Sequence, residues 1–149
     1  AEAWVSFLLR LRGQYGTFLL GDPSGATPRG SASTNAGTPV VNGASQTGDE
    51  LAIDGLPVSA TGYLKAGDYI QLGSGSTATL HKVLEDVDSD GSGAATLNLF
   101  PRVKTAPADG SAVTVTNAKG NFRLNSNETM WDINEASIYG VTFGAVEAI

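Results

Sequence analysis

Short runs in which apolar and polar residues alternate recur through the middle of the chain. Successive side chains on a strand face opposite sides, so this alternation lets each run bury one face. Turn-forming residues separate the runs by roughly 10 to 15 residues, a spacing typical of a small antiparallel barrel or sandwich. The predicted strands are residues 50–53, 68–72, 79–84, 95–100 and 112–116.

The two ends of the chain carry larger apolar side chains. Residues 1–12 place their apolar positions on one helical face and are followed by Gly13, which predicts a short N-terminal helix. A buried strand is the alternative interpretation of the same residues. Strands are predicted after it and throughout the C-terminal end. They are residues 15–20, 121–124, 130–133 and 136–149.

Residues 21–48 separate the N-terminal end from the alternating middle. They contain nine Gly or Pro residues, and only residues 40–41 suit a strand. A structureless loop of this length is unusual inside one compact domain, so we interpret it as a crossing into an inserted module. We therefore predict a mainly β protein in which residues 1–37 and 119–149 form a discontinuous base domain, an antiparallel β-sandwich or barrel. Residues 38–118 form the inserted small β-barrel module.

Composition narrows the possible functions. The chain of 149 residues has no cysteine and one histidine, which excludes disulfides, thiol catalysis and any site with two imidazoles. The formal net charge is −6, so an electrostatic nucleic-acid binder is not expected. Residues 49–90 contain eight acids and two bases, which indicates a separate, solvated unit. The apolar run near the start is too short to span a membrane.

The sharpest local motif is an acidic turn. Asp86, Asp88 and Asp90 alternate and precede Gly91, as in the first half of an EF-hand calcium loop. The twelfth position is Leu97, where that loop needs a bidentate Glu, and strands rather than helices flank the turn. Since Asp and Gly also suit an ordinary hairpin turn, we interpret the three aspartates as a weak calcium candidate only, and predict no metal or other cofactor.

The sequence contains no motif that indicates a catalytic site. His81 lies in an alternating strand, and the chain has no G-x-S-x-G nucleophile motif. Glu128, Asp132 and Glu135 are close in sequence, but nothing fixes the separation that a glycosidase pair requires. The glycines between residues 21 and 30 match no phosphate-binding spacing. We therefore predict no catalytic residues and no cofactor-binding residues.

Tyrosines could in principle form a platform for sugars. The candidates are Tyr63, Tyr69 and Tyr139. Alternation does not say which face of its strand Tyr69 occupies, and core or rim packing is the interpretation that we favour for these tyrosines.

Several segments resemble a known family. Residues 11–23 (LRGQYGTFLLGDP), 64–73 (LKAGDYIQLG) and 97–102 (LNLFPR) look like segments of minor tail proteins from long-tailed bacteriophages and prophages. The resemblance continues into residues 122–124 and 139–143. It implies a non-enzymatic virion component near the tail tip, akin to distal tail proteins.

The same resemblance implies partners and a location. Proteins of this kind form homo-oligomeric rings and contact tail-tube and tip-hub proteins, so we expect self-association without nucleic-acid or membrane partners. The protein would be made in the bacterial host cytoplasm and reside in the virion tail. The alternative is a receptor- or carbohydrate-binding module at the tail tip that uses Tyr63 or Tyr69.

Overall fold

The computed structural model describes residues 17–124 and 145–147. Contacts divide the chain into two compact units, one made of residues 21–120 and the other of the two ends, 1–20 and 121–149. The predicted helix over residues 1–12 and the predicted strand 130–133 lie outside the described residues.

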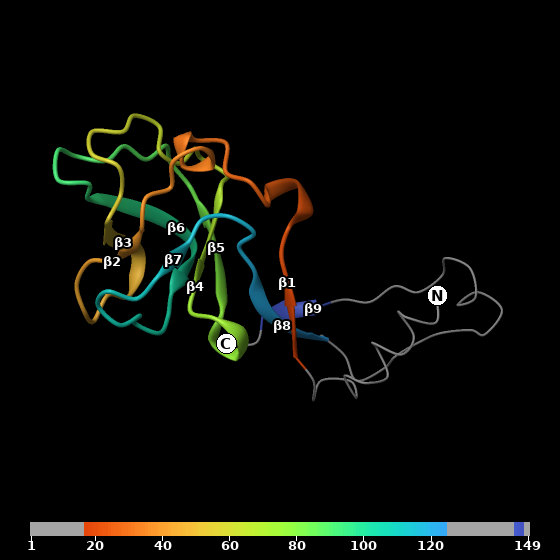
Figure 1. Ribbon diagram of the computed structural model, residues 1–149. Helices are drawn as coiled ribbons and strands as arrows, with labels where there is room; N and C mark the ends of the chain where they lie inside the picture. The colour runs from red at the N-terminus through yellow and green to blue at the C-terminus, as the bar shows by residue number, and fades with distance from the viewer. Residues whose placement is uncertain (1–16, 125–144, 148–149) are drawn as a thin grey trace, which may run out of the picture. The chain divides into compact units, whose positions relative to one another are not determined.

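Residues 21–120 form a six-stranded antiparallel sheet with the order β2-β3-β6-β5-β4-β7 (Figure 1). Each strand matches a run in which the sequence alternates or, for β2, the one apolar pair of the long Gly-rich segment. The prediction of a mainly β, barrel-like fold is therefore confirmed. The strands are β2 (Val40–Val41), β3 (Gly48–Asp54), β4 (Tyr69–Leu72), β5 (Thr79–Val83), β6 (Ala95–Val103) and β7 (Val113–Thr114).

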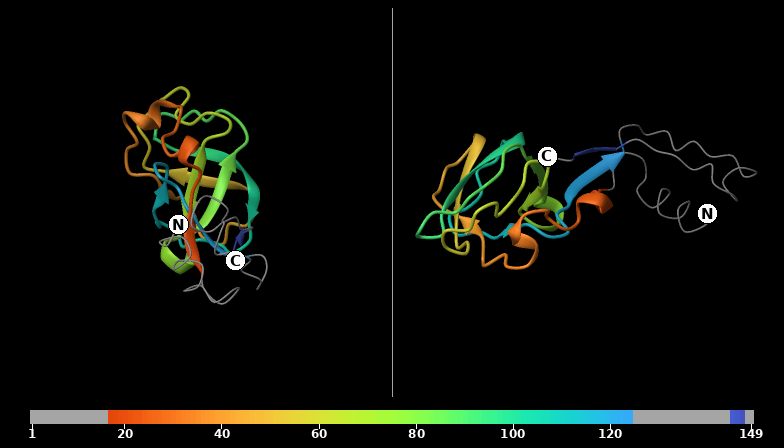
Figure 2. Two further views of the ribbon diagram at one scale, coloured as in Figure 1. Left: turned by 90° about the vertical axis from the view of Figure 1, so that its right-hand side faces the viewer. Right: turned by 90° about the horizontal axis from the view of Figure 1, so that it is seen from above.

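The sheet curls until its two outer strands meet. An isolated antiparallel bridge joins Val40 to Ala112, and the N–H of Val41 donates to the carbonyl of Ser111 at 2.9 Å. The sheet is thus almost closed into a barrel, and Figure 2 shows the strands curving around a common interior. Closure satisfies backbone groups that an open sheet would leave at its edges.

Strand β6 makes this curvature possible because it serves two neighbours. It pairs with β3 on one side, with Leu97 opposite Leu51, and with β5 on the other side, with Leu99 opposite Val83. The β3–β6 register shifts between Gly48, which lies opposite Val103, and Glu50, which lies opposite Asn98, and such an irregularity increases the local twist. The side chains of the Leu97–Leu51 and Leu99–Val83 pairs are buried, because alternation sends them all inward.

The barrel interior is filled by aliphatic side chains and one tyrosine. The largest fully buried side chains come from every long strand and from the connection between β3 and β4. They are Tyr63, Leu51, Ile53, Leu64, Ile70, Leu97, Leu99, Val41 and Val83.

The Gly-rich segment before β2 is more ordered than the sequence suggests. It contains two short 3₁₀ turns, η1 (Pro23–Gly25) and η2 (Ser31–Ser33), and Ala32 is buried in the barrel core. The N–H of Ala32 donates to the carbonyl of Tyr63 at 3.0 Å. Residues 21–37 therefore belong with the barrel, whereas the predicted boundary grouped them with the ends.

A third 3₁₀ turn, η3 (Gly75–Thr77), connects β4 to β5. Within residues 17–124 and 145–147, these turns are the only helical structure, and no helix there has the length and apolar character needed to cross a membrane.

The first and last residues of the barrel segment lie next to each other in space. A Cβ built on Gly21 would lie 3.3 Å from the Cγ of Lys119 and would overlap the carbonyl oxygen of Ala118. The N–H of Asn117 donates to the carbonyl of Ala26 at 2.7 Å. The first and last segments of residues 21–120 are therefore direct neighbours.

The second unit contains a three-stranded sheet with the order β1-β8-β9. Its strands are β1 (Phe18–Leu20), β8 (Gly120–Leu124) and β9 (Ala145–Glu147), and the last two are antiparallel. The rings of Phe18 and Phe122 lie 6.4 Å apart between centroids. Three of the strands predicted for the ends, 15–20, 121–124 and 136–149, thus contain observed strand residues.

Candidate functional site

The three aspartates of the acidic turn bind three different parts of the backbone. Oδ1 of Asp86 accepts from the N–H of Ala66 at 2.9 Å, and Oδ1 of Asp88 accepts from the N–H of Gly62 at 2.7 Å. Asp90 instead closes its own turn, accepting from the N–H of Ala94 at 2.9 Å. The carboxylates therefore act as separate acceptors that hold the β5–β6 connection against residues 62–66.

These hydrogen bonds also favour the charged form of two of the carboxylates. The N–H of Ala66 lowers the pKa of Asp86, with Lys65 adding a favourable charge, and the N–H groups of Ala94 and Ser92 lower the pKa of Asp90. Among the described residues, no three His, Cys, Asp or Glu side chains are grouped as a metal site would require. The geometry accounts for the aspartates as backbone acceptors without any ion.

His81 is a buried strand residue held at both ring nitrogens. Its Nδ1 lies 2.6 Å from the carbonyl oxygen of Pro101, and its Nε2 lies 2.9 Å from Oγ1 of Thr79. A carbonyl can only accept, so Nδ1 carries a proton, and Nε2 can accept from the threonine hydroxyl. The ring joins β5 to β6 from the inside of the barrel and has neither a carboxylate partner nor solvent access.

Tyr63, a candidate for sugar contact, is a core residue. Its side chain is fully buried, and its hydroxyl donates to the carbonyl of Ala36 at 2.6 Å. Burial raises the pKa of Tyr63 to about 12, because the phenolate would lose its hydration. The suggested role at a sugar platform is therefore wrong for this residue.

Tyr69 is half-buried, and its ring contacts other residues of the barrel. The Nζ of Lys82 lies 5.1 Å from the ring centroid, a cation–π arrangement, and Gly25 packs against the ring edge. The hydroxyl donates to Oδ2 of Asp22 at 3.1 Å, and the N–H of Ser24 is the main cause of the lowered pKa of Asp22. Tyr69 thus anchors residues 22–25 to the sheet. Tyr139, the third candidate, lies outside the described residues.

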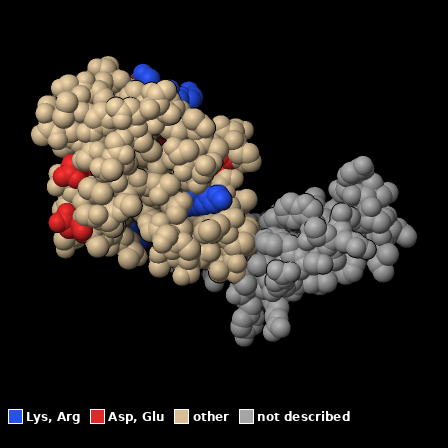
Figure 3. Space-filling model, viewed as in Figure 1, with Lys and Arg blue, Asp and Glu red and all other residues tan. Residues whose placement is uncertain are grey.

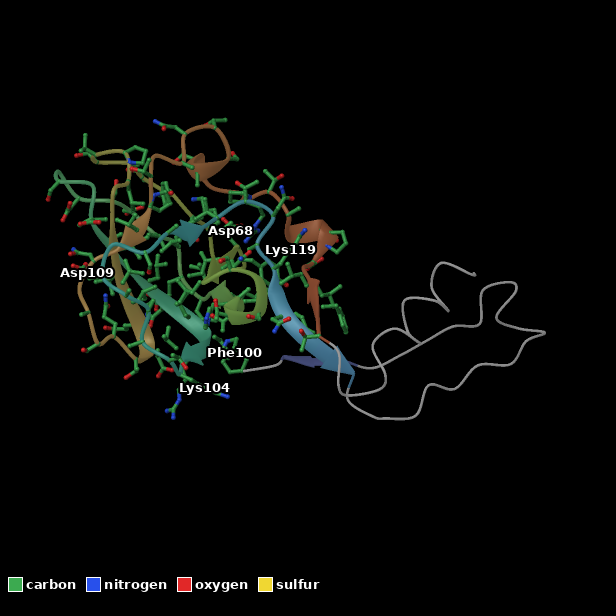
Figure 4. The ribbon with its side chains drawn as sticks, turned by 60° about the horizontal axis from the view of Figure 1, so that its bottom comes forward. Asp68, Phe100, Lys104, Asp109 and Lys119 are labelled. Atoms are coloured by element: carbon green, nitrogen blue, oxygen red, sulfur yellow. The ribbon has the colours of Figure 1, made fainter. Side chains whose placement is uncertain are left out.

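The most distinctive surface of the barrel is the outer side of β5 and β6. Phe100 is 68% exposed and Leu84, just after β5, is 53% exposed. Lys82 stands directly opposite Phe100, and the N–H of Leu84 donates to the carbonyl of Asn98. We call the surface formed by Lys82, Leu84, Phe100 and Arg102 the Phe100 face; Figure 4 labels Phe100 on β6.

Sequence analysis missed Phe100, although the signal was present. Leu97 and Leu99 point inward in an alternating strand, so the next side chain must point outward. Single exposed apolar side chains are common on protein surfaces, but here Phe100 and Leu84 are both exposed on the outer side of two paired strands.

A second surface feature is a groove of about 430 Å³ beside β4 and β7. Hydroxyl-bearing and small residues form most of its lining, without any charged or aromatic side chain. The lining includes Ser74, Thr77, Thr79, Thr105, Ser111 and Thr114. Such a lining can hydrogen-bond a neutral polar ligand but gives it no stacking surface.

Charges are unevenly spread over the barrel. In the view of Figure 3, acidic side chains gather along the left side, and basic side chains lie at the top and over the middle. Smaller acidic patches are also visible near the middle and right of the same view, so both signs occur there.

Comparison with known proteins did not identify the chain. A scan of protein-family models found none that matches, and a search of curated proteins found no significant match.

Proposed function

We propose that this protein is a non-enzymatic structural component of a bacteriophage or prophage tail, near the tail tip. It would act in tail assembly through self-association and through contacts with tail-tube and hub proteins. Two independent lines support the proposal: the resemblance of three sequence segments to minor tail proteins, and an exposed apolar surface on the almost closed barrel.

The Phe100 face is the observation that carries the assembly role. An exposed phenylalanine and leucine side by side, with Lys82 and Arg102 around them, have the composition of a protein contact surface. The histidine and the acidic turn, which were the polar groups weighed as candidates for catalysis or calcium binding, make structural hydrogen bonds in the barrel. His81 bridges two strands, and the acidic turn binds backbone N–H groups.

The test is to look for the protein in particles. Tails purified from an induced lysogen or a phage lysate should contain the chain by mass spectrometry, and labelled antibody should mark one end of the tail in electron micrographs. Deleting the gene should give particles with absent or incomplete tails. Intact, infectious tails without the chain would refute the proposal.

The hydroxyl-lined groove favours a second candidate function, receptor or carbohydrate binding at the tail tip. A glycan array would test it, with Thr105→Val as the groove variant and Tyr69→Ala as a variant of the only described tyrosine with partial exposure. Binding that Thr105→Val weakens would support this second function, and an array without signal would leave assembly as the role.

A further inference from the structure

Beside the Phe100 face, the barrel exposes one other large aliphatic side chain. Among residues 21–120, the exposed large hydrophobic residues are Leu84, Phe100 and Val58, and Val58 is 64% exposed. It follows β3 in the connection to β4, so it lies in a different element from the Phe100 face. The barrel therefore exposes large apolar side chains at two separate positions, and each position can bury apolar area if another molecule binds there.

Val58 lies beside the acidic turn. The N–H of Ser59 donates to the carbonyl of Asp90 at 2.8 Å, and the N–H of Ala60 donates to Oγ of Ser89 at 2.8 Å. Asp88 and Asp90 are exposed, and each carboxylate uses only Oδ1 in its hydrogen bonds. We call the surface formed by Val58, Asp88 and Asp90 the Val58 corner; it combines an apolar side chain with negative charge.

The Phe100 face has the opposite charge. Lys82 and Arg102 are exposed and lie at outward positions of β5 and β6, since the residues that follow each of them, Val83 and Val103, are buried. Lys82 is held in place over the ring of Tyr69. Each surface thus offers an apolar centre with charge beside it, and the charged residues named for the two surfaces differ in sign, while Glu50, opposite Asn98, lies at the edge of the Phe100 face.

We propose that the Phe100 face of one copy binds the Val58 corner of a second copy. This inference rests on the self-association in the proposed function and names the surfaces that make it. Apolar contact between Phe100 and Val58 would remove both from water, while Lys82 and Arg102 would meet Asp88 and Asp90. Because the two surfaces differ, the contact is heterologous, and each copy keeps one unused surface for a further neighbour.

A complementation experiment tests the contact directly. In the full chain, Phe100→Ser removes the apolar centre of one surface and Val58→Ser that of the other. Sedimentation velocity over a wide concentration range should show association of the unmodified protein, and monomers for each variant alone. An equimolar mixture of the two variants should form a one-to-one dimer, since each still carries the surface that the other lacks.

Charge provides a second test. Lys82→Glu combined with Arg102→Glu should raise the dissociation constant by about tenfold or more. Asp88→Asn combined with Asp90→Asn should do the same while keeping an Oδ1 acceptor for each backbone N–H. Lys119→Glu, which changes an exposed charge outside the Phe100 face, is the matched control and should leave association unchanged. Thermal melting close to that of the unmodified protein shows that each variant is folded.

Three results would overturn the inference. The unmodified protein could remain monomeric at every concentration, the mixed variants could remain monomeric, or association could survive both serine substitutions. If other parts of the same chain cover Phe100, then Phe100→Ser would lower the melting temperature without any association to lose. Self-association through these surfaces in a protein absent from tail particles would refute the proposed function and leave this inference standing.

Discussion

The carboxylate of Asp68 accepts the backbone N–H of Arg29 at 3.0 Å, across 39 positions of sequence. Its other oxygen accepts the N–H of Lys65 at 2.8 Å and that of Gly30 at 3.4 Å. The side chain is almost completely buried (3% exposed), with the more exposed guanidinium of Arg29 beside it. One carboxylate thus fastens the segment before β2 to the start of β4.

We predict that Asp68→Asn is strongly destabilising. Both carboxylate oxygens accept backbone N–H groups, so an amide would place its own NH₂ group against one set of donors. The free energy of unfolding should fall by about 2 kcal/mol or more, measured by denaturant titration. Asp88→Asn is the matched control: only Oδ1 of Asp88 accepts a hydrogen bond from Gly62, so the change should be much smaller. Equal effects of the two substitutions would contradict this account.

The acidic turn contains two glycines with different requirements. Gly93 has a φ of +79°, and a Cβ at this position would overlap the carbonyl oxygen of Leu56. Gly93→Ala should therefore cost about 2 kcal/mol or more of stability. A Cβ on Gly91 would meet nothing within 4 Å, so Gly91→Ala should be nearly neutral. Thermal melts of the two variants decide, and a larger loss for Gly91→Ala would contradict the geometry.

Tyr63 should make the protein sensitive to alkali. Its folded pKa of about 12 exceeds its ordinary value of 10.0, so the unfolded chain gives up this proton first as the pH rises. The stabilisation is complete below about pH 10 and is lost as the pH rises toward about 12, for a total of up to about 3 kcal/mol. Denaturant unfolding at a series of alkaline pH values measures it. Tyr63→Phe should lower stability at neutral pH and flatten this dependence, whereas an unchanged slope would exclude Tyr63 as its source.

We predict that calcium does not stabilise the fold. The Oδ1 atoms of the three aspartates in the acidic turn accept hydrogen bonds from separate backbone N–H groups, whereas calcium needs six to eight converging oxygens. At about 1 mM calcium, the melting temperature should shift by less than about 2 °C relative to protein with chelator. A rise above about 5 °C that disappears in Asp88→Asn would establish a true site.

Alternation predicted the strands well because it is a local property. The run around Leu97 and Leu99 fixes both the strand and the side that faces the core, and β4 and β5 follow in the same way. The outward position of Phe100 follows from the same pattern. Alternation gives the side that a residue faces but not which outward residues lie next to one another on paired strands, so the exposed surface of Phe100 and Leu84 was not predicted.

Contacts between distant segments could not be predicted in this way. Nothing local to Asp68 indicates that its partners are the N–H groups of Arg29 and Gly30. Similarly, the composition of residues 21–37, in which short polar residues dominate, favoured a loop outside the barrel. Hydrogen bonds to residues 62–63 and burial of Ala32 place that segment in the barrel. Such long-range pairing appears only when the chain is folded.

The neighbouring positions of Gly21 and Lys119 give the barrel the properties of an exchangeable cassette. A chain that enters and leaves a fold at one point can lose the whole intervening segment, and a linker of a few residues can replace it. The converse also holds: residues 21–120 can be grafted between adjacent strands of an unrelated protein without stretching either junction. Recombination could thus replace this barrel with another while the ends of the chain keep their own strand pairing.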